Sequence, residues 1–267
     1  MILLCCMGLP RVAGAQSNFP QASISNGLVD INFYVPDTDK GYYRGTRFDW
    51  SGVMPRLTYK GHSYCAPWFT NYSPQLHEAV MGPVEGFSPL GYDSSKPAGR
   101  FVQIGVGVLQ NNRTGAYTPF TYYPIVNAGE WKIEKSRRQI SFTHLLHDTG
   151  YSYEYVKTEK LLKDTPVLVI EHRLKNTGRK PIVTDVYNHN LFVLDQQPTD
   201  AGAVISFPFV LAAPAEEQRN IGADKLVSVI DKQLVINGKF APRTSAYTTL
   251  TGFGNTASDY AISIENH

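Results

Sequence analysis

Residues 183–192 carry the side chains of this chain best suited to acid–base chemistry. Side chains alternate between the two faces of a β-strand, so Asp185, Tyr187 and His189 share one face of a strand predicted here. At about 3.3 Å per residue, Asp185 is roughly 13 Å from His189 along the strand, too far to orient the imidazole directly. Histidine titrates near neutral pH and can donate or accept a proton. The face therefore offers one candidate acid, His189, with Tyr187 as its nearer neighbour.

Several familiar chemistries have no signature in the sequence. It holds no G-x-S-x-G, P-loop or H-E-x-x-H pattern, and Gly105-Val106-Gly107 is not followed by a helical pattern. His144 and His147 stand three apart, on opposite faces of a strand, so we expect no zinc site. The net charge of +2 comes without a long basic run, which gives no indication of nucleic acid or an anionic membrane as partner. We expect no metal and no cofactor.

The elements that must position these residues are strands. From Ile24 onward, short apolar alternations are separated by Gly and Pro, and no apolar helical period lasts longer than about two turns. The pattern predicts one all-β domain over residues 16–267, without repeats or linkers. Asn176-Thr177-Gly178 is predicted as a hairpin turn in which the glycine takes a positive φ. The main predicted strands cover residues 53–59, 101–109, 139–146, 151–162, 166–174, 182–192, 226–230 and 234–236.

Residues 1–15 are predicted to be a secretory signal peptide. A short apolar run leads to Ala13 and Ala15, which fit the A-x-A-like cleavage pattern, although the basic n-region is missing. A misassigned start is the alternative. The run is shorter than the roughly 20 apolar residues that span a bilayer, so we expect a periplasmic or secreted protein with no membrane attachment after cleavage.

Cleavage would leave Cys65 as the only cysteine, which excludes an intramolecular disulfide. Cys65 is interpreted as a small buried hydrophobic residue rather than a nucleophile.

The end of the chain is predicted to be an unpaired strand. Residues 260–264 alternate, with Tyr260, Ile262 and Ile264 on one face, and the chain then stops. Exposed strand edges are usually covered. We therefore expect either a C-terminal truncation or an edge strand covered in a dimer.

Residues 168–178 and 188–194 together resemble a block of the aldose 1-epimerase (galactose mutarotase-like) superfamily. In that family, a strand ending in an N-T-G-type turn precedes a strand with the motif N-H-x-x-F-x-L, and Asn188, His189, Phe192 and Leu194 fill this motif. The resemblance extends in order and composition over most of residues 23–265. It implies an all-β antiparallel supersandwich with a concave groove for a sugar.

The resemblance implies two further sugar-binding positions. Arg47, in the segment 43–52, stands where the family places an arginine near the sugar, although Arg47 could equally be a surface charge or pair with Asp49. Glu85, in the segment 81–87, stands where the family's P-x-H-G-F loop has a histidine. A carboxylate there would accept hydrogen bonds from sugar hydroxyls. Trp50, Trp68 and Tyr187 could stack on a sugar or simply pack in the core.

The resemblance also implies a mechanism. A carboxylate removes the proton of the anomeric hydroxyl while a histidine, here His189, protonates the ring oxygen; the ring opens, rotates and closes as the other anomer. The family's glutamate base lies beyond the last residue of this chain, and no Glu present matches it. The leading hypothesis is a sugar-anomer isomerase. The alternatives are a non-catalytic carbohydrate-binding protein with the same groove, and a polysaccharide-processing enzyme.

Overall fold

The computed structural model describes residues 19–92, 98–148, 150–212, 226–240 and 249–266, and these form an all-β protein. They fall into two compact units, one within residues 19–195 and one within residues 196–266. The single domain expected over 16–267 stays a prediction. The predicted signal peptide, residues 1–15, lies outside the described residues. Within the described residues, no helix is long and apolar enough to cross a membrane.

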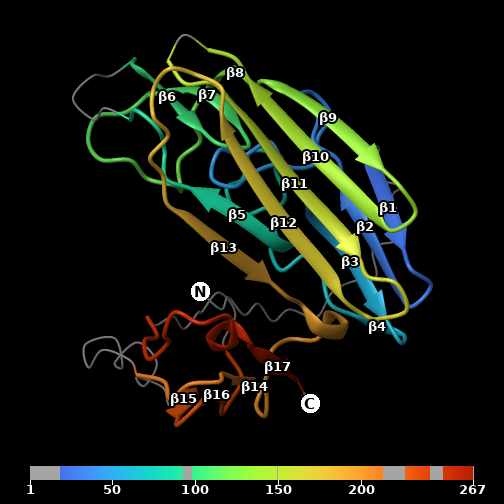
Figure 1. Cartoon of the computed structure of the whole chain (residues 1–267). Coiled ribbons are helices and arrows are strands. Elements are labelled where there is room, and N and C mark those ends of the chain that lie inside the picture. The colour runs from blue at the N-terminus through green and yellow to red at the C-terminus, as the bar shows by residue number, and fades with distance from the viewer. Residues whose placement is uncertain (1–18, 93–97, 149, 213–225, 241–248, 267) are drawn as a thin grey trace. The chain divides into compact units, whose positions relative to one another are not determined.

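One layer of the larger unit is a four-stranded antiparallel sheet in the order β12-β11-β10-β9 (Figure 1). In β10 every second side chain is buried, which confirms the alternation seen in the sequence. Alternation of this kind is what a sheet with one face on the core requires. The four strands are β9 (Glu130–Lys135), β10 (Gln139–Leu146), β11 (Tyr153–Leu161) and β12 (Leu168–Asn176).

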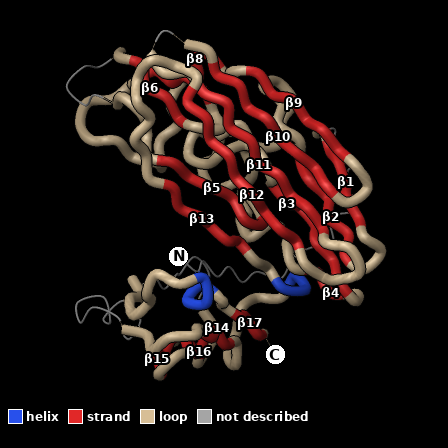
Figure 2. The backbone as a smooth tube through the Cα atoms, in the orientation of Figure 1, coloured by secondary structure: helices blue, strands red, loops and turns tan. Residues whose placement is uncertain are grey.

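Three other sheets of the larger unit face this layer, and Figure 2 shows their strands beside and behind it. Two large aromatic contacts join the layers: the ring centroids of Phe33 and Phe142 are 5.9 Å apart, and those of Phe87 and Tyr155 are 5.4 Å apart. Burial of each such ring contributes roughly 1.5–3 kcal/mol to the stability of the fold. Because these rings join the two layers, the larger unit has a sandwich-like core. The strands of these sheets are β1 (Gln21–Ser25), β2 (Val29–Tyr34), β3 (Val53–Tyr59) and β4 (His62–Ser63); β6 (Arg100–Gln103), β7 (Gly107–Gln110) and β8 (Ile125–Asn127); and β5 (Gly82–Phe87) with β13 (Val186–Leu191).

The predicted strand 101–109 is wrong as a single element. It is a hairpin, β6 paired with β7, that turns through residues 104–106. Gly105 has a φ of 76°, and a Cβ there would stand 2.6 Å from the Cβ of Asp49. The glycines that suggested a punctuated strand are thus used to turn the chain tightly against Asp49.

The predicted hairpin across Asn176-Thr177-Gly178 is also wrong. β12 pairs only with β11 among the described strands, and β13 pairs with β5 instead. Gly178 does not have the positive φ of a two-residue hairpin turn, and its N–H and that of Thr177 donate to the carbonyl of Ser152. The chain therefore leaves the four-stranded sheet at this point and carries β13 to the opposite layer.

The smaller unit holds a four-stranded sheet in the order β15-β16-β14-β17. The pairing of residues 226–230 with 234–236, predicted from the sequence, is confirmed as β15 with β16. The predicted unpaired terminal strand is wrong: the last strand begins only at Ser263 and pairs with β14 at the sheet edge. Tyr260, Ile262 and Ile264 are all exposed. The elements are β14 (Val204–Ser206), β15 (Val227–Ile230), β16 (Gln233–Ile236) and β17 (Ser263–Glu265), with short 3-10 segments η1 (Leu194–Gln196) and η2 (Ala257–Tyr260) elsewhere in the chain.

Candidate functional site

The two-stranded pair of β5 and β13 separates two groups of polar side chains. In its register His189 lies opposite Val84, Asn188 opposite Glu85 and Tyr187 opposite Gly86. Directly paired residues project on the same face, and neighbours along a strand project on opposite faces. His189 and Tyr187 therefore lie on one face of the pair, and Glu85 lies on the other.

The first face carries a group that we call the aromatic–arginine patch: Arg47, Phe48, Phe120, Tyr187 and His189. Phe48 is at its centre, with ring centroids 5.5 Å from His189 and 6.2 Å from Tyr187. The shared face is confirmed for Tyr187 and His189, but the strand begins at Val186, so Asp185 lies outside it. The face of β13 that carries His189 is the more buried one, since Val186 on the other face is 58% exposed.

Glycine makes room for Tyr187. A Cβ at Gly86, directly across the ladder, would overlap the Tyr187 ring. The phenol ring can therefore lie over Gly86 while 42% of the residue stays exposed. The glycine therefore leaves an aromatic ring on this face of the sheet accessible for contact.

Arg47 reaches the same patch from the segment before β3. Its guanidinium carbon lies 4.5 Å from the centre of the Phe48 ring and 5.0 Å from that of Phe120. It makes no ion pair with Asp49, which bonds to Ser51 and Tyr155 instead. The Nε of Arg47 is buried and has no hydrogen-bond partner among the described residues. Phe120, whose ring contacts the guanidinium, is 60% exposed.

The electrostatics of the patch keep His189 neutral. Burial and the nearby Arg47 guanidinium lower the pKa of His189 to about 4. Both effects disfavour an imidazolium, because burial removes hydration and Arg47 already carries a positive charge. At neutral pH, His189 is therefore a hydrogen-bonding group rather than a ready proton donor.

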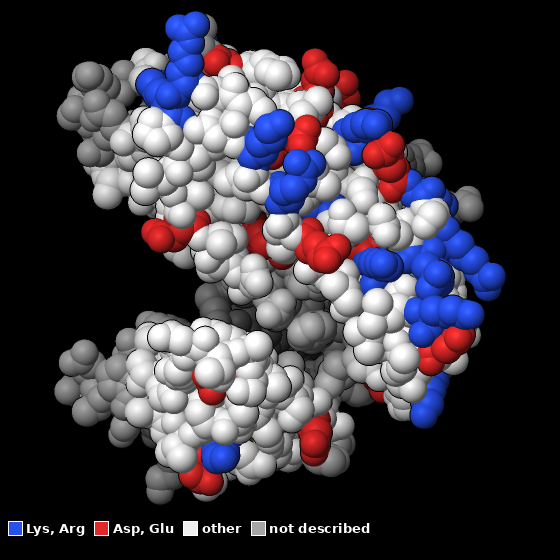
Figure 3. Space-filling view, in the orientation of Figure 1, with Lys and Arg blue, Asp and Glu red and all other residues white. Residues whose placement is uncertain are grey.

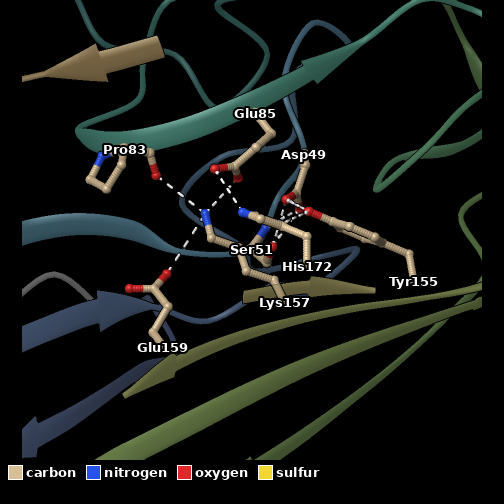
Figure 4. Close-up of polar contacts among 8 residues, drawn as sticks. All are labelled: Asp49, Ser51, Pro83, Glu85, Tyr155, Lys157, Glu159 and His172. Carbon is tan, nitrogen blue, oxygen red and sulfur yellow. Dashed lines mark hydrogen bonds and ion pairs between the residues drawn. The ribbon is translucent and has the colours of Figure 1, made fainter. Parts of the chain in front are cut away.

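The opposite face of β5 carries the buried charge cluster, which comprises Asp49, Glu85, Tyr155, Lys157, Glu159 and His172 (Figure 4). Lys157 is at its centre and is fully buried. Its ammonium group donates to Glu85 at 2.7 Å and to the carbonyl of Pro83 at 3.2 Å, and lies 3.7 Å from Glu159. Glu85 descends from β5 while Lys157 and Glu159 rise from β11, as Figure 4 shows.

A chain of hydrogen bonds extends the cluster toward solvent. The Tyr155 hydroxyl donates to Asp49 at 3.0 Å and also contacts Nδ1 of His172 at 3.0 Å. Nε2 of His172 lies 3.4 Å from Glu85. The side chain of His172 is 32% exposed, whereas those of Glu85 and Lys157 are at most 2% exposed. His172 is thus the point at which the cluster meets the surface.

The carboxylates of the cluster are in different protonation environments. Burial raises the pKa of Glu159 to about 8, and both of its oxygens lack hydrogen-bond donors among the described residues. Burial also raises the pKa of Asp49 to about 6. Burial acts in the same direction on Glu85, but Lys157 and His172 outweigh it and hold the pKa of Glu85 below its usual value. The carboxylates likewise outweigh the effect of burial on Lys157 and raise its pKa.

The structure therefore brings together three of the four predicted site residues. Arg47, Tyr187 and His189 share the aromatic–arginine patch, and Glu85 is separated from them because it projects from the other face of β5. The buried charge cluster ties β5 to β11, and so it positions the strand that supports the patch.

The sequence reasoning missed Phe120, Lys157 and Glu159. A signal for the last two was present, because they share strand parity with Tyr155 and Leu161 and therefore had to face the core. Phe120 had no such signal, since it lies in a loop.

Trp50, Trp68 and Cys65, also singled out in the sequence as possible functional groups, pack in the core. Trp50 is 2% exposed and donates to the Gly45 carbonyl, and Trp68 packs against the same core and donates to Val80, which supports core packing for both. Cys65 is a buried free thiol as predicted, and burial raises its pKa to about 12. In the described part of the chain, no three His, Cys, Asp or Glu side chains are grouped to hold a metal ion.

Comparison with known proteins gives no further identification: no protein-family model, curated protein or solved structure matches the chain.

Proposed function

We propose that this protein binds a carbohydrate at the aromatic–arginine patch. The carrying observation is the convergence of Arg47, Tyr187 and His189 from segments about 140 residues apart in sequence onto one face of β5 and β13. Exposed rings suit the apolar faces of a sugar, and the guanidinium and imidazole suit its hydroxyls. A ligand oxygen would also satisfy the Nε of Arg47, which is buried without a partner among the described residues. The resemblance of residues 188–194 to the mutarotase-like superfamily, which implies a groove for a sugar, also supports the proposal.

The geometry favours binding over turnover. Anomer interconversion needs an acid and a base on either side of one sugar, and the low pKa of His189 leaves it neutral at pH 7. Glu85, the carboxylate predicted for this site, lies on the other face of β5 and is held by Lys157.

The test is to titrate the full chain with a panel of neutral monosaccharides and to measure binding by calorimetry. We expect Tyr187→Ala and Phe120→Ala each to weaken binding about tenfold, which corresponds to about 1.4 kcal/mol. Matched controls are Tyr260→Ala and Phe253→Ala, which remove exposed rings of the smaller unit and should leave affinity unchanged. Absence of binding across the panel, or an equal loss in the controls, contradicts the proposal.

A second candidate is sugar-anomer isomerisation of the aldose 1-epimerase type. It is favoured by the placement of His189, the histidine of the N-H-x-x-F-x-L motif, beside Arg47 on the same patch. Polarimetry on freshly dissolved α-anomers distinguishes the two. Accelerated equilibration that is lost in His189→Asn supports the isomerase, and binding without acceleration supports the carbohydrate-binding protein.

A further inference from the structure

An open hollow of about 640 Å³ lies between the sheet of β1–β3 and the turn that joins β9 to β10, and it shares no residue with the patch. We call it the basic pocket. Its volume is within the range of small-molecule sites, roughly 300–1,000 Å³. Its lining residues are Ser23, Ile24, Ser25, Asp30, Ile31, Asn32, Arg56, Lys135, Ser136 and Arg137.

The strand register builds one wall of the basic pocket from polar side chains. Ser23 is paired with Asn32, and Asn32 with Arg56, so these three form a row across β1, β2 and β3. Ser25 and Asp30 form the next row on the same face, two residues along each strand. The intervening Ile24 and Ile31 are buried on the core side, which fixes the polar rows outward.

The turn after β9 builds the other wall and is held against the sheet. The N–H of Ser25 donates to the carbonyl of Arg137 at 2.8 Å, and the N–H of Ser136 donates to Gln139 at 2.8 Å. The first bond holds the turn at Arg137 against β1, and the second closes the turn that follows Lys135, the last residue of β9. The pocket is therefore a built concavity between two hydrogen-bonded elements.

The charge of the basic pocket is unbalanced. Arg56, Lys135 and Arg137 give three positive charges against one carboxylate, Asp30, and none of the three cations makes an ion pair within the described residues. Figure 3 shows Lys and Arg gathered over the side of the larger unit that carries β1 and β2 in Figure 1. Guanidinium groups bind carboxylate and sulfate oxygens in a two-pronged geometry, so the pocket suits an anionic group.

We propose that the basic pocket binds an acidic saccharide, a sugar that carries a carboxylate or sulfate group. The two arginines and Lys135 would hold the anionic group. Three serine hydroxyls and the Asn32 amide would exchange hydrogen bonds with the sugar hydroxyls. Asp30 would accept from a hydroxyl, and it would repel a ligand that is anionic throughout. This site is independent of the aromatic–arginine patch.

The test is a titration of the isotope-labelled full chain with glucuronate and with glucose 6-sulfate, read at the amide resonances of residues 23–32 and 135–137. This localised readout does not count binding at the patch. We expect both acidic sugars to shift these resonances, and Arg56→Gln/Arg137→Gln to weaken binding at least about tenfold. Lys175→Gln/Arg179→Gln is the matched control, since it removes two exposed cations outside the pocket and should bind as the unmodified chain does.

Several results would overturn the proposal. They are an absence of shifts with either acidic sugar, an equal loss in the control variant, glucose binding as tightly as glucuronate, or inorganic sulfate binding as tightly as glucose 6-sulfate. The substitutions are at exposed positions and should change stability by no more than about 0.5 kcal/mol, which thermal unfolding checks. Sugar binding at the patch should be unaffected by Arg56→Gln/Arg137→Gln, so the two proposals can fail separately.

Discussion

Replacing Lys157 by Met tests whether the buried charge cluster stabilises the larger unit. The substitution keeps the length of the side chain but removes the ammonium that bonds Glu85 at 2.7 Å and the Pro83 carbonyl at 3.2 Å. Among the described residues, Glu85, with a side chain 2% exposed, would keep only the side-chain contact with His172 at 3.4 Å. Breaking one partner of a buried ion pair costs about 3–5 kcal/mol, because the remaining charge is left without compensation. For a unit of this size, that corresponds to a fall in Tm of about 6–20 °C.

The assay is urea unfolding followed by the fluorescence of the three tryptophans, at pH 7 and at pH 4. The pKa of Glu85 is depressed in the folded state, so its pairing stabilises the protein above the unfolded pKa and this stabilisation is lost as pH falls. In Lys157→Met, Glu85 can take up a proton at low pH. The difference in unfolding free energy between variant and unmodified chain should therefore shrink toward pH 4.

The control is the double variant Lys157→Met/Glu85→Gln, which removes both charges. It should recover most of the lost stability, because replacing a whole buried pair is far less costly than breaking it. A loss below about 1 kcal/mol at pH 7 would equal that of a surface ion pair and would refute the reasoning. A double variant less stable than Lys157→Met would refute it as well.

Three further predictions concern the cluster and the patch. The folded pKa of Glu159, about 8, exceeds the usual 4.5, so the unfolding free energy should fall as pH rises from about 4.5 to 8. Glu159→Gln should remove this pH dependence and add roughly 1–3 kcal/mol to the unfolding free energy at pH 8. A loss of stability in this variant at pH 8 would show instead that Glu159 is an ionised partner of Lys157. Gly52→Ala should lower the unfolding free energy, measured by thermal unfolding, by about 2 kcal/mol or more, because Gly52 has a φ of 74° and an added Cβ would meet the Lys157 and Glu159 side chains. An unchanged stability would contradict this packing. Sugar binding at the patch should be constant by calorimetry from pH 8 to about pH 5 and weaken near pH 4, where His189 takes up a proton beside Arg47; a transition near pH 6.5 would contradict a buried, neutral His189.

Much of the strand content could be predicted from local patterns. Alternation in residues 139–146 and 151–162 indicated strands with one buried face, and the two strands pair with each other as antiparallel neighbours in the structure. The burial of Cys65 followed from its residue type. The site could be predicted in part, since the shared face of Tyr187 and His189 follows from the period of a strand.

Strand partners could not be predicted in the same way. Asn176-Thr177-Gly178 has the composition of a hairpin turn, yet the next strand, β13, pairs with β5, about 100 residues earlier in the chain. Turn composition reports only local conformation, whereas pairing depends on which distant edge is free and which apolar face the new strand can cover. The same limit hid the position of Glu85, because its face was set by the register of β5 and not by its neighbours in sequence.

The sequence by itself determined that the chain is all-β, which residues alternate inward, and that a histidine and a phenol share one face of a strand. Only the tertiary structure decided that Arg47 joins that face while Glu85 is buried on the other side with Lys157. The physical reason is that side-chain direction along a strand is a local property with a period of two. Contact between residues far apart in sequence depends on the pairing and packing of whole sheets.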